Sequence, residues 1–124
     1  MKTGFILIVE NKKEFRDKIM ELFTPDMAML DAADGEEALE MLDENPQINC
    51  VISAVRMLKM DGLDLIKTTR QKKNKVPFIL VTSYASEEQE REVKDLGAFA
   101  LLEKPLDYKK LVETVHQAIE ISPD

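Results

Sequence analysis

Short apolar segments recur along the chain at intervals that suit alternating strands and helices. Three of them, at residues 5–9, 49–53 and 77–81, are hydrophobic at nearly every position. Strands that are covered on both faces have this pattern, whereas a strand with one face in water alternates between apolar and polar residues. Two further segments, at 27–32 and 99–102, are also β-branched or aliphatic enough to be strands. The pattern therefore predicts five strands, several of them buried on both faces.

The segments that follow the predicted strands have the spacing of amphipathic helices. Apolar residues recur there every three or four positions, which places them on one stripe of a helix. Phe15, Ile19 and Phe23 form such a stripe, and Leu111, Val115 and Ala118 form another. Five helical segments are predicted in this way, at 12–23, 38–42, 63–70, 86–96 and 111–119.

Start and stop signals support these boundaries. Asn11, Asp34 and Ser86 each precede a predicted helix and are answered three residues later by Glu or Gln, as in a capping box. Gly97 suits the end of the fourth helix. Strands that alternate with helices, joined by right-handed crossovers, predict an α/β fold with a doubly wound parallel sheet. We expect a single domain over residues 1–124, with its core at 4–121.

Composition and charge restrict the classes of function that this chain can have. Hydrophobic residues make up 44% of the 124 residues and charged residues 33%, which is typical of a globular protein. The net charge is −7, and because nucleic-acid affinity depends on Lys and Arg, we expect this domain to bind no nucleic acid. The single cysteine, Cys50, lies in an apolar run and is predicted to be a buried hydrophobe. The first apolar run is too short for a signal-peptide core or a membrane span, so we expect a cytoplasmic protein without membrane association.

The candidate site residues lie at the carboxyl ends of the predicted strands. Ligands of open α/β sheets bind beyond the carboxyl ends of the strands. Glu10 follows the first strand, Ala54 the third, Thr82 and Ser83 the fourth, and Lys104 the fifth. We therefore expect an acid, a hydroxyl and a lysine to converge on one edge of the sheet.

These residues lie in segments that resemble the response-regulator receiver domain of two-component signalling. The segments are 5–11, 34–39, 51–62, 81–83, and Gly97-Ala98 through Lys104-Pro105, and the resemblance spans residues 4–121. No single motif is decisive, but five occur in order at matching spacings. The resemblance implies a flavodoxin-like, five-stranded sheet of order 2-1-3-4-5, with five helices distributed over both faces.

The resemblance also implies a phospho-acceptor position, and this chain departs from the family there. In the family an aspartate at the end of the third strand takes a phosphoryl group from a phosphohistidine, helped by a divalent cation that neighbouring acids hold. Counting back eight residues from Gly62 places that aspartate at Ala54. A methyl group cannot attack phosphorus, so nucleophile and metal ligand are lost together.

The cation site is reduced as well. The usual acidic pair after the first strand is Glu10-Asn11 here. The cation ligands that remain are the Glu10 carboxylate, an amide oxygen and the Arg56 carbonyl. Because Mg²⁺ prefers carboxylates, we expect it to bind weakly or not at all, and we expect no other cofactor. Glu10 and Asn11 also fit a simpler interpretation as a strand end and helix cap. Asp61, before Gly62, suits a helix cap better than a nucleophile.

Other family positions are retained or altered. Thr82 matches the hydroxyl that reports phosphorylation, and Lys104 matches the lysine that contacts the phosphoryl oxygens. In the family the peptide bond that corresponds to Lys104–Pro105 is cis. The aromatic switch residue is replaced by Leu101, although Tyr84 lies close enough in sequence to substitute for it. We hypothesise that Lys104 pairs permanently with Glu10 and that Arg56, folded inward, occupies the vacated cation position. The site would then be closed to chemistry.

The leading interpretation is a pseudo-receiver, which is not an enzyme and acts through protein–protein interaction without aspartyl phosphorylation. Its expected partner is a histidine kinase, another signalling domain or a second copy of the chain. The dimer contact would use the face of the fourth helix, fifth strand and fifth helix, with Tyr108 and Val112 as possible apolar contacts. The sequence leaves open which partner binds, what the output is, and whether the chain stands alone.

Two alternatives stay open. In the first, the domain is a phosphorylatable receiver into which Ala54 was introduced, although Leu58 and Asn11 also depart from the family and argue against a single blocking change. In the second, the sheet belongs to a flavin- or nucleotide-binding enzyme. That enzyme would need a phosphate-binding loop rich in Gly, Ser or Thr after the first strand, which residues 10–14 do not offer.

Overall fold

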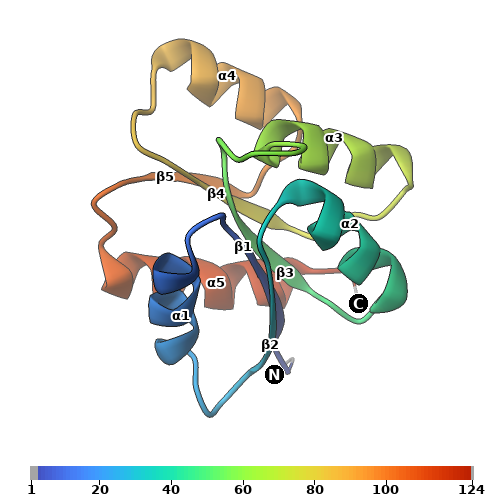
Figure 1. Ribbon diagram of the computed structural model, residues 1–124, viewed down its shortest axis with the longest axis vertical. Coiled ribbons are helices and arrows are strands. Elements are labelled where there is room, and N and C mark those ends of the chain that lie inside the picture. Colours follow the sequence, from blue (N-terminus) through green and yellow to red (C-terminus); the bar gives the residue numbers. More distant parts are fainter. Residues whose placement is uncertain (1–2, 124) are drawn as a thin grey trace.

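Five parallel strands form one sheet in the order β2-β1-β3-β4-β5, which confirms the predicted topology (Figure 1). The computed structural model describes residues 3–123. Each predicted strand is present within one or two residues of its expected bounds. The strands are β1 (Phe5–Val9), β2 (Ala28–Ala32), β3 (Cys50–Ala54), β4 (Phe78–Thr82) and β5 (Ala100–Glu103).

Helices cover both faces of this sheet. α1 and α5 lie on one face, and α2, α3 and α4 lie on the other (Figure 1). Each strand is followed by a helix, so the chain returns to the same edge of the sheet before the next strand begins. The helices are α1 (Lys13–Glu21), α2 (Gly35–Glu44), α3 (Gly62–Gln71), α4 (Glu87–Asp95) and α5 (Tyr108–Ile121).

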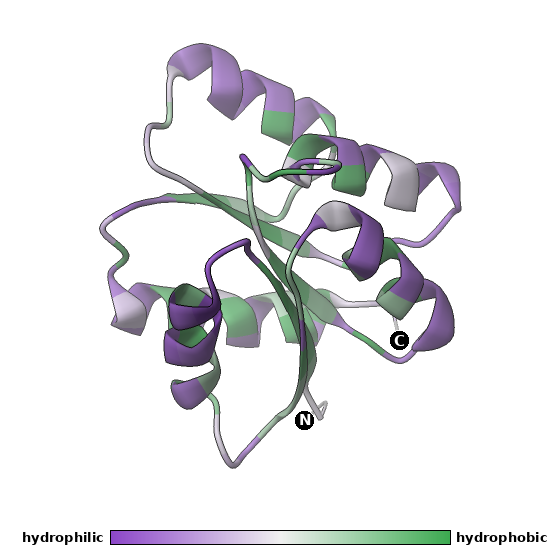
Figure 2. Cartoon of the chain, in the orientation of Figure 1, coloured by the Kyte–Doolittle hydropathy of each residue, from purple (hydrophilic) through white to green (hydrophobic). Residues whose placement is uncertain are grey.

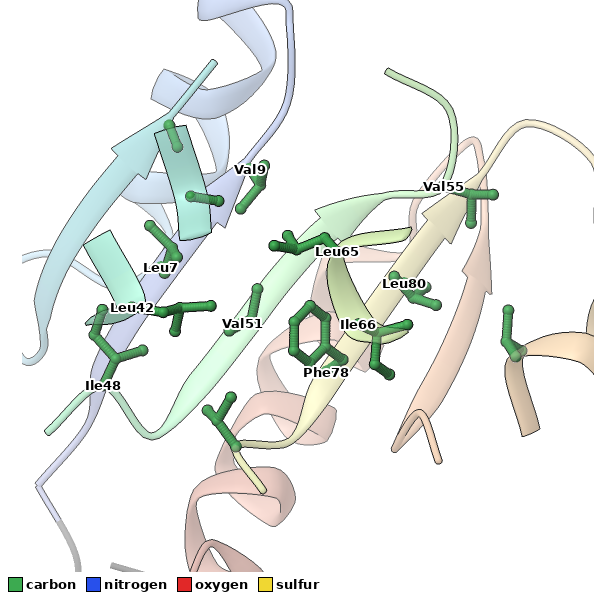
Figure 3. Packing of buried hydrophobic residues seen from close by; sticks show 14 residues of the cluster. Leu7, Val9, Leu42, Ile48, Val51, Val55, Leu65, Ile66, Phe78 and Leu80 are labelled. Atoms are coloured by element: carbon green, nitrogen blue, oxygen red, sulfur yellow. The ribbon is translucent and has the colours of Figure 1, made fainter. Parts of the chain in front are cut away.

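Alternate residues of each strand enter two separate hydrophobic clusters. Leu7 and Val9 of β1 belong to the cluster to which α2, α3 and α4 also contribute, together with Phe78 of β4 (Figure 3). Ile6 and Ile8 point the opposite way and pack against α1 and α5. β1, β3 and β4 are largely apolar because both of their faces are covered, whereas the outer strands β2 and β5 are more exposed and contain Asp31 and Glu103. Figure 2 shows the result, with hydrophobic strands inside and hydrophilic outer helix surfaces.

Most of the predicted helix boundaries are confirmed. The side chains of Asp34 and Ser86 accept hydrogen bonds from backbone N–H groups three residues later, and Asp61 caps α3 in the same way. Gly97 follows α4 with a φ of 81°, a backbone conformation that favours glycine. The cap predicted at Asn11 is wrong, because Lys12 is the N-cap residue of α1 and makes no side-chain cap bond.

Within residues 3–123, no helix has both the length and the apolar character that a membrane crossing requires.

Candidate functional site

The carboxyl ends of β1, β3, β4 and β5 surround a cavity of about 520 Å³. The parallel topology produces this convergence, because every strand of the sheet ends at the same edge. Lys12, Val81, Tyr84, Ser86 and Gln89 form part of its wall. The predicted site residues that line it are Glu10, Asn11, Ala54, Arg56, Thr82, Ser83 and Lys104.

Ala54 is the last residue of β3 and pairs with Val81 of β4. Its side chain is a methyl group, and the residue is only 7% exposed. The following loop returns tightly over this strand end, since the N–H of Gly62 donates to the carbonyl of Val55 at 2.9 Å. A Cβ on Gly62 would lie 2.1 Å from the Ala54 carbonyl oxygen, so only glycine fits there.

Glu10 is the one carboxylate of the cavity wall, and it is 5% exposed. Its Oε1 lies 4.0 Å from the ammonium of Lys104, which makes a long ion pair. The Lys104 ammonium also lies 4.3 Å from the centre of the Phe15 ring. Oε2 of Glu10 is buried and has no hydrogen-bond partner. The expected pairing of Lys104 with Glu10 is present as this long contact, but it leaves a cavity between the strand ends.

Asn11 holds the end of β1 to two other segments. Its Nδ2 donates to the carbonyl of Ala33 at 2.7 Å, and its Oδ1 accepts from the N–H of Leu58 at 3.1 Å. These bonds explain why Asn11 does not cap α1. They also engage the amide oxygen that was expected to be available to a cation.

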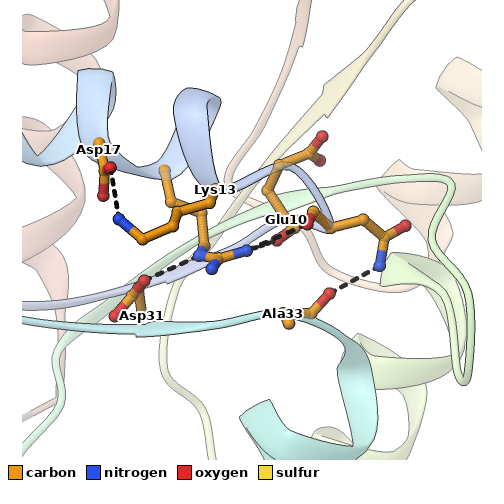
Figure 4. A network of polar contacts seen from close by, with 7 residues as sticks. Glu10, Lys13, Asp17, Asp31 and Ala33 are labelled. Carbon is orange, nitrogen blue, oxygen red and sulfur yellow. Dashed lines mark hydrogen bonds and ion pairs between the residues drawn. The ribbon is translucent and has the colours of Figure 1, made fainter.

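Arg16 secures the same strand end from α1 (Figure 4). Its guanidinium donates to the Glu10 carbonyl at 2.6 Å and to the Asn11 carbonyl at 3.2 Å. Its Nε donates to the carboxylate of Asp31 in β2 at 2.8 Å. The backbone on which Glu10 and Asn11 sit is thus tied to both a helix and a neighbouring strand.

Arg56 lines the cavity at its exposed rim, and its side chain is not folded inward to the buried position beside Glu10 as expected. Its side chain is 79% exposed, and its Nη1 lies 3.7 Å from Oδ2 of Asp61. Asp61 is fixed because its other carboxylate oxygen accepts the N–H of Asp64 at the start of α3. The position that a cation would take is therefore not filled by this arginine.

The loop after β4 is held by its own contacts. The Thr82 hydroxyl donates to the Tyr84 carbonyl at 3.2 Å and accepts from the Tyr84 N–H at 3.3 Å. One residue further on, the N–H of Ala85 donates to the carboxylate of Glu103 at 3.0 Å. The Tyr84 side chain is left 73% exposed.

Three predicted residues lie outside the cavity wall. Leu101 of β5 is half-buried against the cluster beneath α2, α3 and α4, and it lines a separate cavity of about 420 Å³. Tyr108 and Val112 of α5 are half-buried against the opposite cluster, and Lys18 lies 5.5 Å from the centre of the Tyr108 ring. The bond between Lys104 and Pro105 is cis, as the resemblance implies.

Sequence reasoning missed Phe15 and Arg16 as residues of this site. Phe15 was recognised only as part of an apolar helix stripe, yet its ring supports the Lys104 ammonium. No sequence signal marks Arg16, because its partner Asp31 is 15 residues away on another element. A contact of this kind depends on how α1 packs beside β2.

The oxygen donors of the cavity do not fit a magnesium site. Among residues 3–123 no group of three or more His, Cys, Asp or Glu side chains is placed to hold a metal ion. Glu10 supplies one carboxylate, the Asn11 oxygen is already hydrogen bonded, and Ala54 supplies no side-chain oxygen. Mg²⁺ is usually bound by carboxylates in octahedral geometry, and this set is too small.

Comparison with known proteins agrees with the fold. The family described as "Response regulator receiver domain" matches residues 6–116. The transcriptional regulatory protein FixJ of Bradyrhizobium diazoefficiens is 29% identical over 118 residues, covering 94% of this chain and 57% of FixJ. The transcriptional regulatory protein CpxR of Escherichia coli is 31% identical over 118 residues, covering 94% of this chain and 50% of CpxR. The chain thus spans about half the length of these curated relatives.

Solved structures match over nearly the whole chain. The chemotaxis protein CheY4 of Vibrio cholerae superimposes with a TM-score of 0.85 at 27% identity, covering 94% of this chain and 99% of that one. A response regulator receiver protein of Pseudomonas putida gives a TM-score of 0.86 at 29% identity, covering 94% and 98%. Because the family match runs from the first strand into the last helix and the fold agrees, this chain belongs to the response regulator receiver domain family of two-component signalling.

Proposed function

We propose that this receiver domain works without aspartyl phosphorylation, as a module that binds another signalling protein. The observation that carries the proposal is the methyl group of Ala54, which ends β3 where the family has its acceptor carboxylate. Phosphoryl transfer to a receiver needs an oxygen nucleophile in line with the phosphorus atom. On this proposal the domain performs no chemical step of its own.

The small number of oxygen ligands left for a divalent cation supports the same proposal. The acceptor carboxylate of a receiver also holds the divalent cation, so a change to alanine removes both roles. Glu10 is left as the single carboxylate, and the Asn11 amide is engaged with Ala33 and Leu58. We infer that Mg²⁺ binds weakly or not at all, and that the domain uses no other cofactor.

The partner we propose is a histidine kinase, another signalling domain or a second copy of this chain. A contact through α4, β5 and α5 is compatible with the exposed charged surface of α4, of which only Val93 is buried. Tyr108 and Val112 would contribute only the parts of their side chains that their own core leaves uncovered.

Intact-mass spectrometry tests the proposal directly. The protein is incubated with acetyl phosphate and MgCl₂, beside a receiver that has an intact acceptor as a positive control for the phosphodonor. We expect no added phosphoryl group on the natural sequence. A phosphoryl adduct on any of its residues would contradict the proposal.

A variant with two restored aspartates tests whether the missing carboxylates are the reason that the domain is not phosphorylated. Ala54→Asp combined with Asn11→Asp restores carboxylates beside Glu10, Thr82 and Lys104, which already line the cavity. We expect this variant to gain one phosphoryl group under the same conditions. If the natural sequence and the rebuilt variant are both inert while the positive control reacts, the missing carboxylates are not the sole obstacle.

A further inference from the structure

The polar side chains that a molecule entering the strand-end cavity can reach are mainly hydrogen-bond donors. Oε2 of Glu10 and Oε1 of Gln89 lack partners, but both atoms are buried, so an entering group does not meet them. The Asn11 amide oxygen and the Thr82 hydroxyl already accept backbone N–H groups. The donors of the wall that solvent reaches are Lys12, Arg56, Ser83 and Lys104.

The wall of this cavity is positively charged, although the chain carries a net charge of −7. Three cationic side chains of the described residues line it, against the single carboxylate of Glu10. Lys104 approaches Glu10 only to 4.0 Å, and Arg56 approaches Asp61 only to 3.7 Å. Lys12 forms no ion pair within residues 3–123. Since long pairs at a wet surface are weak, these cations are incompletely neutralised.

The cations are accessible to a molecule that enters. The side chain of Arg56 is 79% exposed and that of Lys104 is 30% exposed, while Lys12 and Ser83 are exposed as whole residues. The cavity measures about 520 Å³. A water molecule takes up about 30 Å³ of the liquid, so the cavity has ample room for a carboxylate group.

The mouth of the cavity carries two exposed apolar side chains. Tyr84 lines the cavity and is 73% exposed, and Leu58 is 76% exposed. The N–H of Leu58 is bonded to Asn11 of the wall, which places Leu58 at the same rim. Scattered exposed hydrophobic residues are ordinary, but two beside a positively charged hollow form a surface with both apolar and polar character, as protein interfaces have.

We propose that this cavity receives the carboxylate of an aspartate or glutamate side chain of a partner protein. Lys12, Arg56 and Lys104 supply the cations that pair with it, and Leu58 and Tyr84 contact apolar residues beside it. This inference rests on the proposed function, because an acceptor aspartate would place a carboxylate of this chain where the partner's carboxylate enters. It assigns the partner's contact to the strand-end edge of the sheet, and not to the face of α4, β5 and α5.

A carboxylate suits these donors better than a cation or a neutral group. Hydrogen bonds between ionised groups are about twice as strong as neutral ones, and a guanidinium can bind both oxygens of a carboxylate through parallel N–H groups. A cation would meet three like charges and a Glu10 residue that is only 5% exposed. Because salt screens charges beyond a Debye length of about 8 Å, the cations of the wall outweigh the more distant acids of the chain.

Acetate is the simplest probe of the anchor, and acetamide is its neutral counterpart of the same shape. Each is titrated into the ¹⁵N-labelled protein at constant ionic strength, and the amide signals of Lys12, Arg56 and Ser83 are followed by NMR. We expect saturable shifts with acetate and none with acetamide, because contacts between charges supply the binding. Added NaCl should weaken the binding of acetate.

A variant without two of the cations tests which side chains hold the anion. Lys12→Gln combined with Arg56→Gln removes both charges, keeps polar side chains and alters only exposed positions. We expect acetate to bind at least about fivefold more weakly, because each exposed charge pair contributes modestly. Lys67→Gln, an exposed position on α3 outside the cavity wall, is the matched control and should bind acetate like the natural sequence.

Peptides test the partner and the apolar rim. Short random displayed peptides are selected on the natural sequence and counter-selected on the variant without Lys12 and Arg56. We expect enriched peptides to carry an acidic residue beside apolar ones, and to bind at least about tenfold more weakly when the acid is changed to its amide. Leu58→Ser and Tyr84→Ser should weaken these peptides but leave acetate binding unchanged, because acetate is too small to contact the cations and the rim together.

Several results would overturn the inference. Acetate shifts that never saturate, equal shifts with acetamide, or unchanged acetate binding in the double variant would contradict the anchor. Enriched peptides without an acidic residue would contradict the partner. A phosphoserine peptide that binds at least about tenfold more tightly than the matching glutamate peptide would assign the cavity to a phosphorylated partner instead. Phosphoryl uptake by the natural sequence would overturn the proposed function, so the two failures are distinguishable.

Discussion

The side-chain amide of Asn11 joins three segments of the chain by hydrogen bonds. An amide donates to one partner and accepts from another at once, whereas a carboxylate only accepts. Asn11 uses both capacities, on Ala33 and Leu58, and so joins the ends of β1 and β2 to the loop after β3. The amide at this position therefore makes a pair of structural contacts that a carboxylate could not make.

This role predicts that Asn11→Asp destabilises the protein. The carboxylate loses the bond to the Ala33 carbonyl and sets two acceptors against each other, so we expect a loss of about 1–2 kcal/mol in the free energy of unfolding. Urea denaturation at pH 7 measures it. Lys12→Ala, an exposed neighbour, should change the free energy by less than about 0.5 kcal/mol. A variant as stable as the natural sequence would show that the amide bonds carry no net stability.

Cys50 predicts a clear dependence on pH. Burial raises the pKa of its thiol to about 12, because desolvation penalises the thiolate. The unfolded chain loses this proton near the ordinary value of about 9, so the folded state binds more protons between the two values. The contribution to stability is complete below about pH 9 and is lost as pH rises toward 12.

We therefore expect Cys50 in the native protein to resist a thiol reagent such as DTNB at pH 8 and to react once urea unfolds the chain. The absorbance of the released thiolate follows the reaction. Rapid labelling without denaturant would contradict the burial of this residue.

At the scale of elements, the loop between β3 and α3 depends on a close approach. A Cβ on Gly62 would lie 2.1 Å from the Ala54 carbonyl oxygen, a distance that no rotamer can relieve. We expect Gly62→Ala to cost at least about 2 kcal/mol in the free energy of unfolding. Lys67→Ala, exposed on the same helix, is the control. Equal stability of the two variants in urea would rule out the tight approach.

α4 is attached to the core by few buried side chains. Val93 is its only buried residue, whereas α5 buries Leu111, Val115, Ala118 and others. Helices with few buried apolar contacts open locally at low cost. We expect the amides of α4 to exchange with deuterium faster than those of α5, as measured by native-state hydrogen exchange. Slower exchange in α4 would point to a contact on its outer surface.

At the scale of the whole molecule, the two hydrophobic clusters share one sheet. Leu7 and Ile8 are neighbours in β1 but enter opposite clusters. We expect Leu7→Ala and Ile8→Ala each to cost about 2–5 kcal/mol. Both should shift a single transition, the same by near-UV and far-UV circular dichroism. Separate transitions in either variant would mean that the two layers fold independently.

The architecture could be predicted from the sequence because it depends on residue pattern. The doubly apolar strands and the capped helices predicted a doubly wound parallel sheet, and the resemblance to receiver domains implied the strand order 2-1-3-4-5 that the structure has. The bounds of β2, β3, β4 and β5 differ from the predicted ones by one residue at one or both ends.

The directions of polar side chains could not be predicted in the same way. Arg56 lies with its exposed side chain near Asp61, whose other carboxylate oxygen caps α3. The Asn11 side chain does not cap α1, because it is hydrogen bonded to the Ala33 carbonyl and the Leu58 N–H of two other segments. Lys104 was expected to lie near Glu10, but the Phe15 ring beneath its ammonium is set by the packing of α1. Such contacts join segments that are distant in sequence, and periodicity carries no information about them.

Glu10, Ala54 and Lys104 belong to neither hydrophobic cluster, although the cavity they line lies at the ends of the most buried strands. Substitutions of Glu10 or Lys104 therefore remove no side chain from either hydrophobic cluster. The charge of the cavity can thus be altered at these two positions while the packing between the sheet and its helices keeps all of its side chains.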